Sequence, residues 1–443
     1  MKLLARWSIG LTLLSLPLWF VGPAPTAAAA PVPGAVPDFD GDGRPDLAIG
    51  GMGAIEVRYG DGRKQRLDHD DLGAAEPYAL GNVLLTRDFN GDGYADLALP
   101  DRPARALVQV FGGPHGLDAA TLHRSPAPTG VGGFGFSIAL LTKPTPLLVV
   151  GGGLRDGGGG ALAAYPLGAD GRPKGTPFWI TQDSPGVPGK NENGDFFGFS
   201  LAAEGAILVV GNPMEDVGKV WNAGSVVVLT YKGGTSFSGI GFDQNSRGVA
   251  DKAEHGEQFG RFVAIGRGYI AVGVSGERGG SGSIQLFTAA AKPRPLYAID
   301  QNSRGIPGRN EAEDGFGESV AIARLCDGRT GLVVGGPGEE VGGGTGAAWT
   351  IPLSRTKACP ARMIVEGPGE VLGGSRVKGG SLGSAVTTLR APNTKADTLA
   401  LGGNGSGSGA DTRVYALTPP YSTGTAVYTG PGLPEGVGLS APS

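Results

Sequence analysis

Short apolar stretches alternate with glycine-rich turns along almost the whole chain. One pattern recurs seven times: a run of Val, Leu, Ile and Ala that ends in a turn. These turns begin at Gly50, Pro100, Gly151, Gly211, Gly273, Gly335 and Gly402. No segment keeps the i, i+3, i+4, i+7 stripe of an amphipathic helix for more than a turn or two. The pattern therefore predicts many short β-strands and no long helix.

A second marker precedes most of these turns by about fifteen residues and divides the chain into repeats. It is a Phe-Gly or Leu-Gly pair, and the pairs begin at Leu80, Phe134, Phe197, Phe259, Phe316 and Leu382. Each repeat then holds four strand-like stretches over roughly 50 to 67 residues, which is typical of a β-propeller blade. A single blade cannot bury both of its faces, so blades pack around an axis. We predict an all-β, seven-bladed β-propeller over residues 31–430.

The two ends of the chain differ from the repeats. Lys2 and Arg6, an apolar run and the small residues up to Ala30 predict a signal peptide at 1–30 that is cleaved near Ala30. Residues 431–443 are rich in Gly, Pro and Ser, which indicates a flexible tail. The first repeat lacks a Phe-Gly pair, so we expect the segment 425–428 to help close the ring.

The composition and net charge of the chain argue against some classes of function. The chain has 83 Gly and 34 Pro, and its formal charge of -4 becomes -6 once Lys2 and Arg6 are removed. An acidic chain without a basic patch gives no indication of nucleic-acid binding. After the signal peptide no apolar run reaches the length of about 20 residues that a spanning helix needs. We expect a secreted protein with no membrane span.

Two acidic nonapeptides, 38–46 and 88–96, carry the candidate chemistry. Oxygen-bearing side chains at positions 1, 3, 5 and 9, with Gly at position 6 and a carbonyl at position 7, suit a calcium ion. The predicted ligands are Asp38, Asp40, Asp42, the carbonyl of Arg44 and Asp46, and then Asp88, Asn90, Asp92, the carbonyl of Tyr94 and Asp96. Ile49 and Leu99 occupy position 12, where an EF-hand needs Glu. Tight turns without metal are the alternative.

The chain has two cysteines, Cys326 and Cys359. In an exported protein a disulfide between them is plausible, and two unrelated small apolar residues are the alternative.

The Phe-Gly marker, the turns Gly211–Pro213 and Gly335–Pro337, and the acidic nonapeptides together resemble FG-GAP repeats. These form the propeller of integrin α-subunits and occur in many secreted bacterial proteins. The resemblance implies calcium loops between the first and second strands of a blade, on the face opposite the ligand. It implies two structural Ca²⁺ ions in this chain.

The opposite face is the candidate partner surface. Three connections are near copies, and they begin at Gln182, Asp243 and Asp300. Possible partner-binding residues there are Trp221, Asn245, Arg247, Asn302 and Arg304. Asx-type turns explain the loops equally well, and an ordinary Trp covers a strand edge.

No constellation indicates an active site. The four histidines are scattered, and the Gly-x-Ser-x-Gly match at 379–383 falls in a Phe-Gly position, where no nucleophile elbow forms. We therefore predict a non-catalytic binding or adhesion module for a surface protein or glycan. The alternative is a secreted carbohydrate-active enzyme that uses acidic loop residues. A lectin would show aromatic pockets between blades, and the loops have few aromatics.

Overall fold

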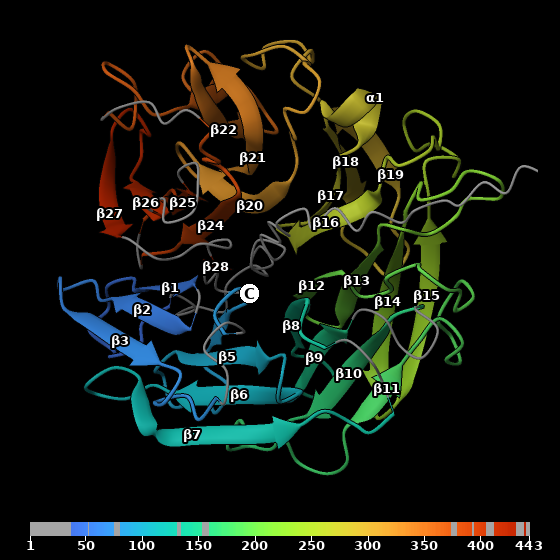
Figure 1. Ribbon diagram of the computed structural model, residues 1–443, viewed down its shortest axis with the longest axis vertical. Coiled ribbons are helices and arrows are strands. Elements are labelled where there is room, and N and C mark those ends of the chain that lie inside the picture. Colours follow the sequence, from blue (N-terminus) through green and yellow to red (C-terminus); the bar gives the residue numbers. More distant parts are fainter. Residues whose placement is uncertain are drawn as a thin grey trace, which may run out of the picture.

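The computed structural model describes residues 37–51, 53–74, 80–130, 134–152, 159–373, 379–391, 394–404, 412–430 and 438–439. Seven antiparallel sheets of four strands surround a central axis (Figure 1). The seven-bladed, all-β architecture predicted from the sequence is confirmed. The predicted signal peptide, 1–30, lies outside the described residues. None of the helices in the described part is both long and apolar enough to cross a bilayer.

The blades follow one another along the chain, and within each the strands run from the axis outward in chain order. Blade 1 has β28 (Gly438–Leu439), β1 (Leu47–Gly51), β2 (Ala54–Arg58) and β3 (Lys64–Asp68); blade 2 has β4 (Leu85–Arg87), β5 (Asp96–Asp101), β6 (Ala106–Phe111) and β7 (Asp118–Pro126); blade 3 has β8 (Ser137–Leu141), β9 (Leu147–Gly152), β10 (Ala161–Pro166) and β11 (Phe178–Ile180). Only β28 departs from chain order.

The remaining four blades repeat this plan. Blade 4 has β12 (Ser200–Glu204), β13 (Ile207–Asn212), β14 (Ser225–Gly233) and β15 (Ser236–Phe242); blade 5 has β16 (Phe259–Gly266), β17 (Tyr269–Val274), the short α1 (Glu277–Gly280), β18 (Ser283–Thr288) and β19 (Pro295–Ile299); blade 6 has β20 (Ser319–Leu325), β21 (Arg329–Val341), β22 (Gly344–Pro352) and β23 (Arg362–Ile364); blade 7 has β24 (Ala385–Leu389), β25 (Thr398–Asn404), β26 (Thr412–Leu417) and β27 (Gly424–Gly430).

The ring closes differently from the prediction. Residues 425–428 lie in β27, the outermost strand of blade 7, so the expectation that they close the ring is wrong. The innermost strand of blade 1 is β28, in which Gly438 pairs with Gly50 and Leu439 with Ile49. Residues 438–439 belong to the segment predicted to be a flexible tail. Among the described residues no strand precedes β1 in the chain, and the short β28 covers the inner edge of β1.

Apolar side chains fill the spaces between neighbouring blades. Phe197 and Phe259, both from Phe-Gly pairs, are fully buried, and Phe259 packs with residues of blades 4 and 5. Burial of such a side chain contributes about 1.5–3 kcal/mol. The phenylalanines of the repeat marker therefore fill space between neighbouring blades.

Near the axis, glycines let the backbones of adjacent blades touch. A Cβ on Gly211 in β13 would lie 1.9 Å from the carbonyl oxygen of Gly260 in blade 5. The same oxygen accepts a hydrogen bond of 2.8 Å from the hydroxyl of Ser200 in β12. Blades 4 and 5 are thus joined backbone to backbone at a place where only glycine fits.

Cys326 and Cys359 form a disulfide with a Cα–Cα distance of 6.0 Å. Cys326 directly follows β20 and Cys359 precedes β23, so the bond links two hairpin connections within blade 6. The predicted pairing is therefore present in the structure.

The antiparallel order gives the propeller two kinds of face. The hairpin face carries the connections between first and second strands and between third and fourth strands. The crossover face carries the loops between second and third strands and the connections from one blade into the next. The two acidic nonapeptides belong to the hairpin face, and the three near-copy connections belong to the crossover face.

Candidate functional site

The acidic nonapeptides occupy equivalent places in blades 1 and 2. Residues 38–46 lead into β1, and residues 88–96 join β4 to β5. The last carboxylate of each, Asp46 or Asp96, is fully buried. Asp46 accepts backbone N–H groups from Phe39 at 2.6 Å and Gly60 at 2.8 Å. This carboxylate therefore ties each loop to the end of the third strand of its own blade.

Asp96 repeats that arrangement in blade 2. It accepts N–H groups from Phe89 at 2.7 Å and from Gly112 at 2.9 Å. Burial raises the pKa of Asp96 to about 7, and the negative charges of Asp92 and Asp88 act in the same direction. Burial likewise raises the pKa of Asp46 to about 7. Both loops thus concentrate negative charge that a cation would stabilise.

The other carboxylates of the first loop fit a hard cation. Carboxylate oxygens of Asp38, Asp40 and Asp42 lie within 4.8 Å of one another. Backbone N–H groups of Asp42 and Gly43 donate to Asp38 at 3.0 and 2.8 Å, which holds the turn around these oxygens. The guanidinium of Arg63 pairs with Asp40, which shows that the site accepts positive charge.

The second loop has the same turn with one amide in place of a carboxylate. Asp88 accepts N–H groups from Asp92 at 3.2 Å and Gly93 at 2.9 Å. Asn90 accepts the N–H of Asp92 at 3.0 Å and donates its own amide N–H to the Asp92 carboxylate at 2.8 Å. The donor set of three carboxylates, one amide oxygen and the Tyr94 carbonyl is the kind that calcium takes.

The predicted partner residues on the crossover face divide into two groups. Trp221 is 58% exposed, and its ring lies 4.5 Å from the ring of His255. Asn245 accepts the backbone N–H of Ala253 at 3.2 Å, and Asn302 accepts that of Asn310 at 3.2 Å. The two asparagines therefore stabilise their own loops, as the turn interpretation predicts. Trp221 remains a surface residue, and so do the exposed Arg247 and Arg304.

The structure also brings together residues that the sequence analysis did not single out. At the entrance to blades 4, 5 and 6, a buried glutamine donates from Nε2 to a glutamate of the next blade, which lies between the second and third strands in blades 4 and 5 and near the end of the second strand, β21, in blade 6. The pairs are Gln182–Glu215 at 2.9 Å, Gln244–Glu277 at 3.0 Å, and Gln301–Glu339. One sequence signal could have revealed these pairs. Each glutamate stands four residues after the glycine at which the second strand of its repeat turns, which is Gly211, Gly273 or Gly335.

Burial changes the acidity of these glutamates. It raises the pKa of Glu215 to about 7 and that of Glu339 to about 7. In both cases the glutamine hydrogen bond opposes the shift. Burial raises the pKa of Glu277 to about 8, and the charges of Glu257 and Asp251 add to the shift. The crossover face therefore holds carboxyl groups that exchange protons near neutral pH.

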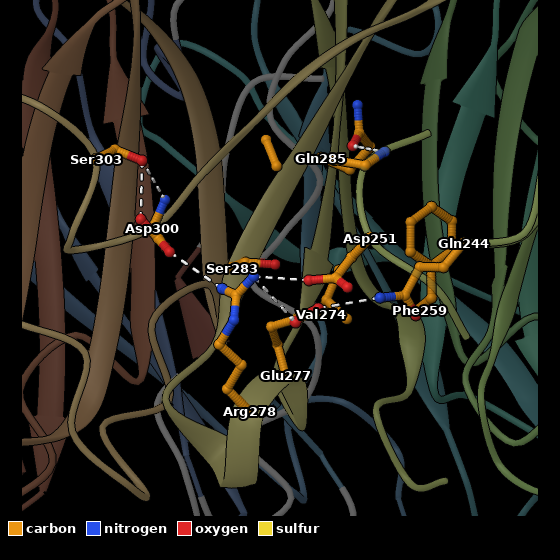
Figure 2. Close-up of a pocket in the computed structure, with 12 residues that line it drawn as sticks. Gln244, Asp251, Phe259, Val274, Glu277, Arg278, Ser283, Gln285, Asp300 and Ser303 are labelled. Atoms are coloured by element: carbon orange, nitrogen blue, oxygen red, sulfur yellow. Dashed lines mark hydrogen bonds and ion pairs between the residues drawn. The ribbon is translucent and has the colours of Figure 1, made fainter. Parts of the chain in front are cut away.

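Two pockets lie beside these pairs, at the same place in neighbouring blades. The blade 5 pocket has a volume of about 140 Å³ and is shown in Figure 2. The blade 4 pocket has a volume of about 250 Å³. Both are lined by the glutamine–glutamate pair, by the loop entering the blade, and by an aspartate after the fourth strand, Asp243 or Asp300. The crossover face is thus a polar surface with repeated small cavities.

Comparisons with known proteins agree with this geometry. Residues 38–99, which include both acidic nonapeptides, match the family described as FG-GAP-like repeat. Sheets, ring and loops together define the class as an FG-GAP repeat β-propeller. No curated protein matches the chain by sequence.

Solved structures show the same fold at low identity. A candidate 6-phosphogluconolactonase from Bacteroides fragilis is 12% identical with a TM-score of 0.50, over 90% of this chain and 98% of the other. A protein from Lactobacillus plantarum is 13% identical with a TM-score of 0.50, over 89% of this chain and 98% of the other. At these identities the likeness concerns the fold alone. The chain is thus a seven-bladed β-propeller in which residues 38–99 match the FG-GAP-like repeat family.

Proposed function

We propose that this protein is an exported, non-catalytic binding module whose crossover face recognises a surface protein or a glycan. The main support for the proposal is that the crossover face has small pockets at the same place in blades 4 and 5. Volumes of about 140 and 250 Å³ fall below the roughly 300–1,000 Å³ of pockets that enclose whole small ligands. Such pockets fit one side chain or part of one sugar ring, as in a recognition surface.

Two calcium ions on the hairpin face are part of the proposal. Asp38, Asp40, Asp42 and Asp46 would hold one, with the carbonyl of Arg44. The corresponding residues of 88–96 would hold the other. When bound, the ion supplies positive charge that neutralises the buried carboxylates of its loop. The ions would brace blades 1 and 2 and would not touch the partner, because the partner surface is on the other face.

Export is supported by the disulfide between Cys326 and Cys359. Such bonds persist in oxidising compartments outside the cytoplasm. The formal charge of -4 gives no support for a nucleic-acid partner. These features agree with adhesion to a protein or glycan at a cell surface.

One observation favours the enzyme alternative. Glu277 has a pKa raised to about 8 by burial, and it lies in a cavity with Asp251 and Asp300. A carboxyl of raised pKa close to other carboxylates is the arrangement that glycosidases use. Against it, Arg278 is placed between Asp251 and Asp300 at 2.6 and 3.1 Å. The guanidinium occupies the space that a scissile bond would need.

The test is an array of glycans and surface peptides, probed with the mature protein in calcium and in chelator. We expect retention of a specific partner with no product released, measured by mass spectrometry of the eluate. Sugar fragments in the eluate would replace this proposal by the enzyme alternative. Loss of all specific retention in both buffers would leave no support for a binding module.

A further inference from the structure

The two acidic loops differ at their third position, where the first loop has Asp40 and the second has Asn90. The two side chains are placed alike within their turns. Oδ1 of Asp40 accepts the backbone N–H of Asp42 at 3.2 Å. Oδ1 of Asn90 accepts that of Asp92 at 3.0 Å. Asn90 has only one side-chain oxygen, so Oδ1 is the one atom of this side chain that could ligate calcium. The matching Oδ1 of Asp40 is therefore the ligand expected in the first loop, which leaves Oδ2 for another partner.

The atom left over in each loop has a different partner. In the second loop it is the amide nitrogen Nδ2 of Asn90, which donates to the Asp92 carboxylate at 2.8 Å. In the first loop it is a carboxylate oxygen, and two carboxylates repel each other where an amide and a carboxylate attract. Oδ2 of Asp40 instead pairs with the guanidinium of Arg63. The aspartate thus has a cation as its partner, which the neutral asparagine does not need.

The guanidinium of Arg63 is held in place from several sides. Its Nε lies 2.6 Å from the Asp61 carboxylate, and its Nη1 donates to the His115 carbonyl of blade 2 at 3.3 Å. The guanidinium carbon lies 4.4 Å from the centre of the Tyr59 ring. The Arg63 side chain is 48% exposed, and that of Asp40 is 2% exposed. The positive charge is therefore fixed at the edge of the loop, against a carboxylate that water hardly reaches.

Arg63 offsets the additional carboxylate of the first loop. Positions 1, 3, 5 and 9 carry four carboxylates in 38–46 and three in 88–96. With one guanidinium added to the first set, the two sets have equal net charge. The corresponding hairpin of blade 2, residues 112–117, contains neither arginine nor lysine. Arg44 also lies near the first loop, but its side chain is 63% exposed, so water screens its charge. The first loop thus has an aspartate with its counter-charge where the second loop has a neutral asparagine.

We propose that Arg63 sets the calcium affinity of the first loop. It neutralises one oxygen of Asp40 and leaves the other for the ion, and its positive charge opposes the binding of a further cation. Arg63 acts through Asp40, so it is a positioning residue and not a ligand. This inference rests on the calcium sites of the proposed function. It adds a determinant that lies outside the nonapeptide 38–46, in the hairpin between β2 and β3.

The size of the effect depends on how well water screens the two charges. The Asp40 carboxylate is nearly closed to solvent, which strengthens the repulsion between a cation on one oxygen and the guanidinium on the other. Arg63 is half exposed, so solvent and salt reduce that repulsion. A single charge next to a ligand of a divalent ion should then change the affinity for that ion by about tenfold. An ion pair that only fastened the loop would act with the opposite sign, because its loss would loosen the ligands and weaken calcium binding.

The test measures the calcium affinity of each loop separately in the full mature protein. Calcium chloride is titrated into chelator-treated protein, and the NMR shifts of the Gly43 and Gly93 amides are followed. These glycines occupy the same position in the two turns, and their N–H groups donate to Asp38 at 2.8 Å and to Asp88 at 2.9 Å. Gly43 therefore reports on the first loop and Gly93 on the second, which serves as the reference within the same molecule. We expect one saturable shift at each glycine.

Three variants complete a double-mutant cycle on the ion pair. Arg63→Gln removes the counter-charge and should tighten calcium binding at Gly43 by about tenfold. Asp40→Asn leaves the guanidinium without its carboxylate and should weaken binding at Gly43 by about tenfold or more. The double variant has the net charge of the second loop and should return to within about threefold of the wild type. At Gly93, in the next blade, each variant should stay within about threefold of the wild type, since solvent and salt screen the change.

Two further substitutions provide matched controls. Arg63→Lys keeps the positive charge, so its calcium affinity at Gly43 should stay closer to the wild type than to Arg63→Gln. Arg66→Gln removes the same charge from an exposed position of β3 and should leave the affinity at Gly43 unchanged. Thermal melting followed by circular dichroism shows whether a variant disturbs the fold. If Arg63→Gln does so, Arg63→Met offers a second neutral replacement.

The results separate this inference from the proposed function. Equal or weaker calcium affinity at Gly43 in Arg63→Gln would overturn the role of Arg63 while the calcium sites stand. A double variant that binds calcium as weakly as Asp40→Asn would do the same. No saturable shift at Gly43 or Gly93 in any of the proteins would remove the calcium sites and this inference with them. Retention of a partner on the array would in that case still support the binding function of the crossover face.

Discussion

The contact between blades 4 and 5 at Gly211 allows a substitution whose effect can be worked out from the structure. In Gly211→Ala the new methyl group would lie 1.9 Å from the carbonyl oxygen of Gly260 and 2.2 Å from the hydroxyl of Ser200. Real Cβ contacts stay beyond 3.0 Å, so the two backbones must separate by about 1 Å. Overpacking of this kind costs about 1–3 kcal/mol.

The separation also weakens the hydrogen bond from Ser200 to Gly260. That bond is buried, and a buried carbonyl left without a donor costs a further 1–3 kcal/mol or so. We therefore expect Gly211→Ala to lower the free energy of unfolding by about 3 kcal/mol or more. That is a large part of the roughly 5–15 kcal/mol that a folded protein has.

Gly241→Ala is the matched control. Gly241 is also a strand glycine of blade 4 with no left-handed backbone, but its added methyl would find its nearest neighbour at 3.7 Å. We expect a change within about 0.5 kcal/mol. Urea unfolding of both variants, followed by tryptophan fluorescence at constant calcium, measures the difference. Equal midpoints for the two variants would refute the close approach of blades 4 and 5.

Three further predictions concern metal, protons and the disulfide. Saturating calcium should raise the free energy of unfolding by about 1.4–2.7 kcal/mol per site at ten to a hundred times Kd; calorimetric melting that is identical in EDTA and in calcium would contradict the two sites. The pKa of Glu277 rises on folding from 4.5 to about 8, so its stabilising effect is complete below pH 4.5 and lost as pH rises through 8. Glu277→Gln should flatten this part of the pH–Tm curve, and an unchanged slope would contradict the shift. Replacing Cys326 and Cys359 by serine opens a loop with a sequence separation of 33 and should cost about 3–4 kcal/mol; an unchanged Tm in oxidising buffer would argue against that estimate.

The blade architecture could be predicted from the sequence because its signals are local. A strand that ends in glycine and a Phe-Gly pair stand within one repeat, and each makes a contact that recurs in most blades. Gly211 illustrates this, because the glycines at the same position, Gly50, Gly151, Gly273 and Gly335, also approach the backbone of the next blade closely, while Pro100 takes this position in blade 2. Ring closure could not be predicted in the same way, because Gly438–Leu439 is too short to show any hydrophobic pattern.

The acidic loops could be predicted from the sequence, whereas the crossover pockets could not. All ligands of the first loop lie within 38–46, so spacing alone indicates the chemistry. Gln182 and Glu215 are 33 residues apart and come from different blades. Their meeting depends on how one blade's exit loop covers the next blade, which is a property of packing. The repeat of the pair in three blades was visible in the sequence, but its spacing has no meaning until the ring is known.

The loop that enters blade 5 differs from its two near copies at Asp251. Asp251 stands where the neighbouring copies have Gly189 and Gly308, and all three have a left-handed backbone, with φ of 68°, 98° and 104°. An aspartate tolerates this conformation less well than glycine does. The carboxylate at this place holds Arg278, so its ion pair offsets the backbone cost. Blade 4 has neither the aspartate nor the arginine and keeps glycine at this position, so the strained aspartate occurs in the copy where it has an ion-pair partner.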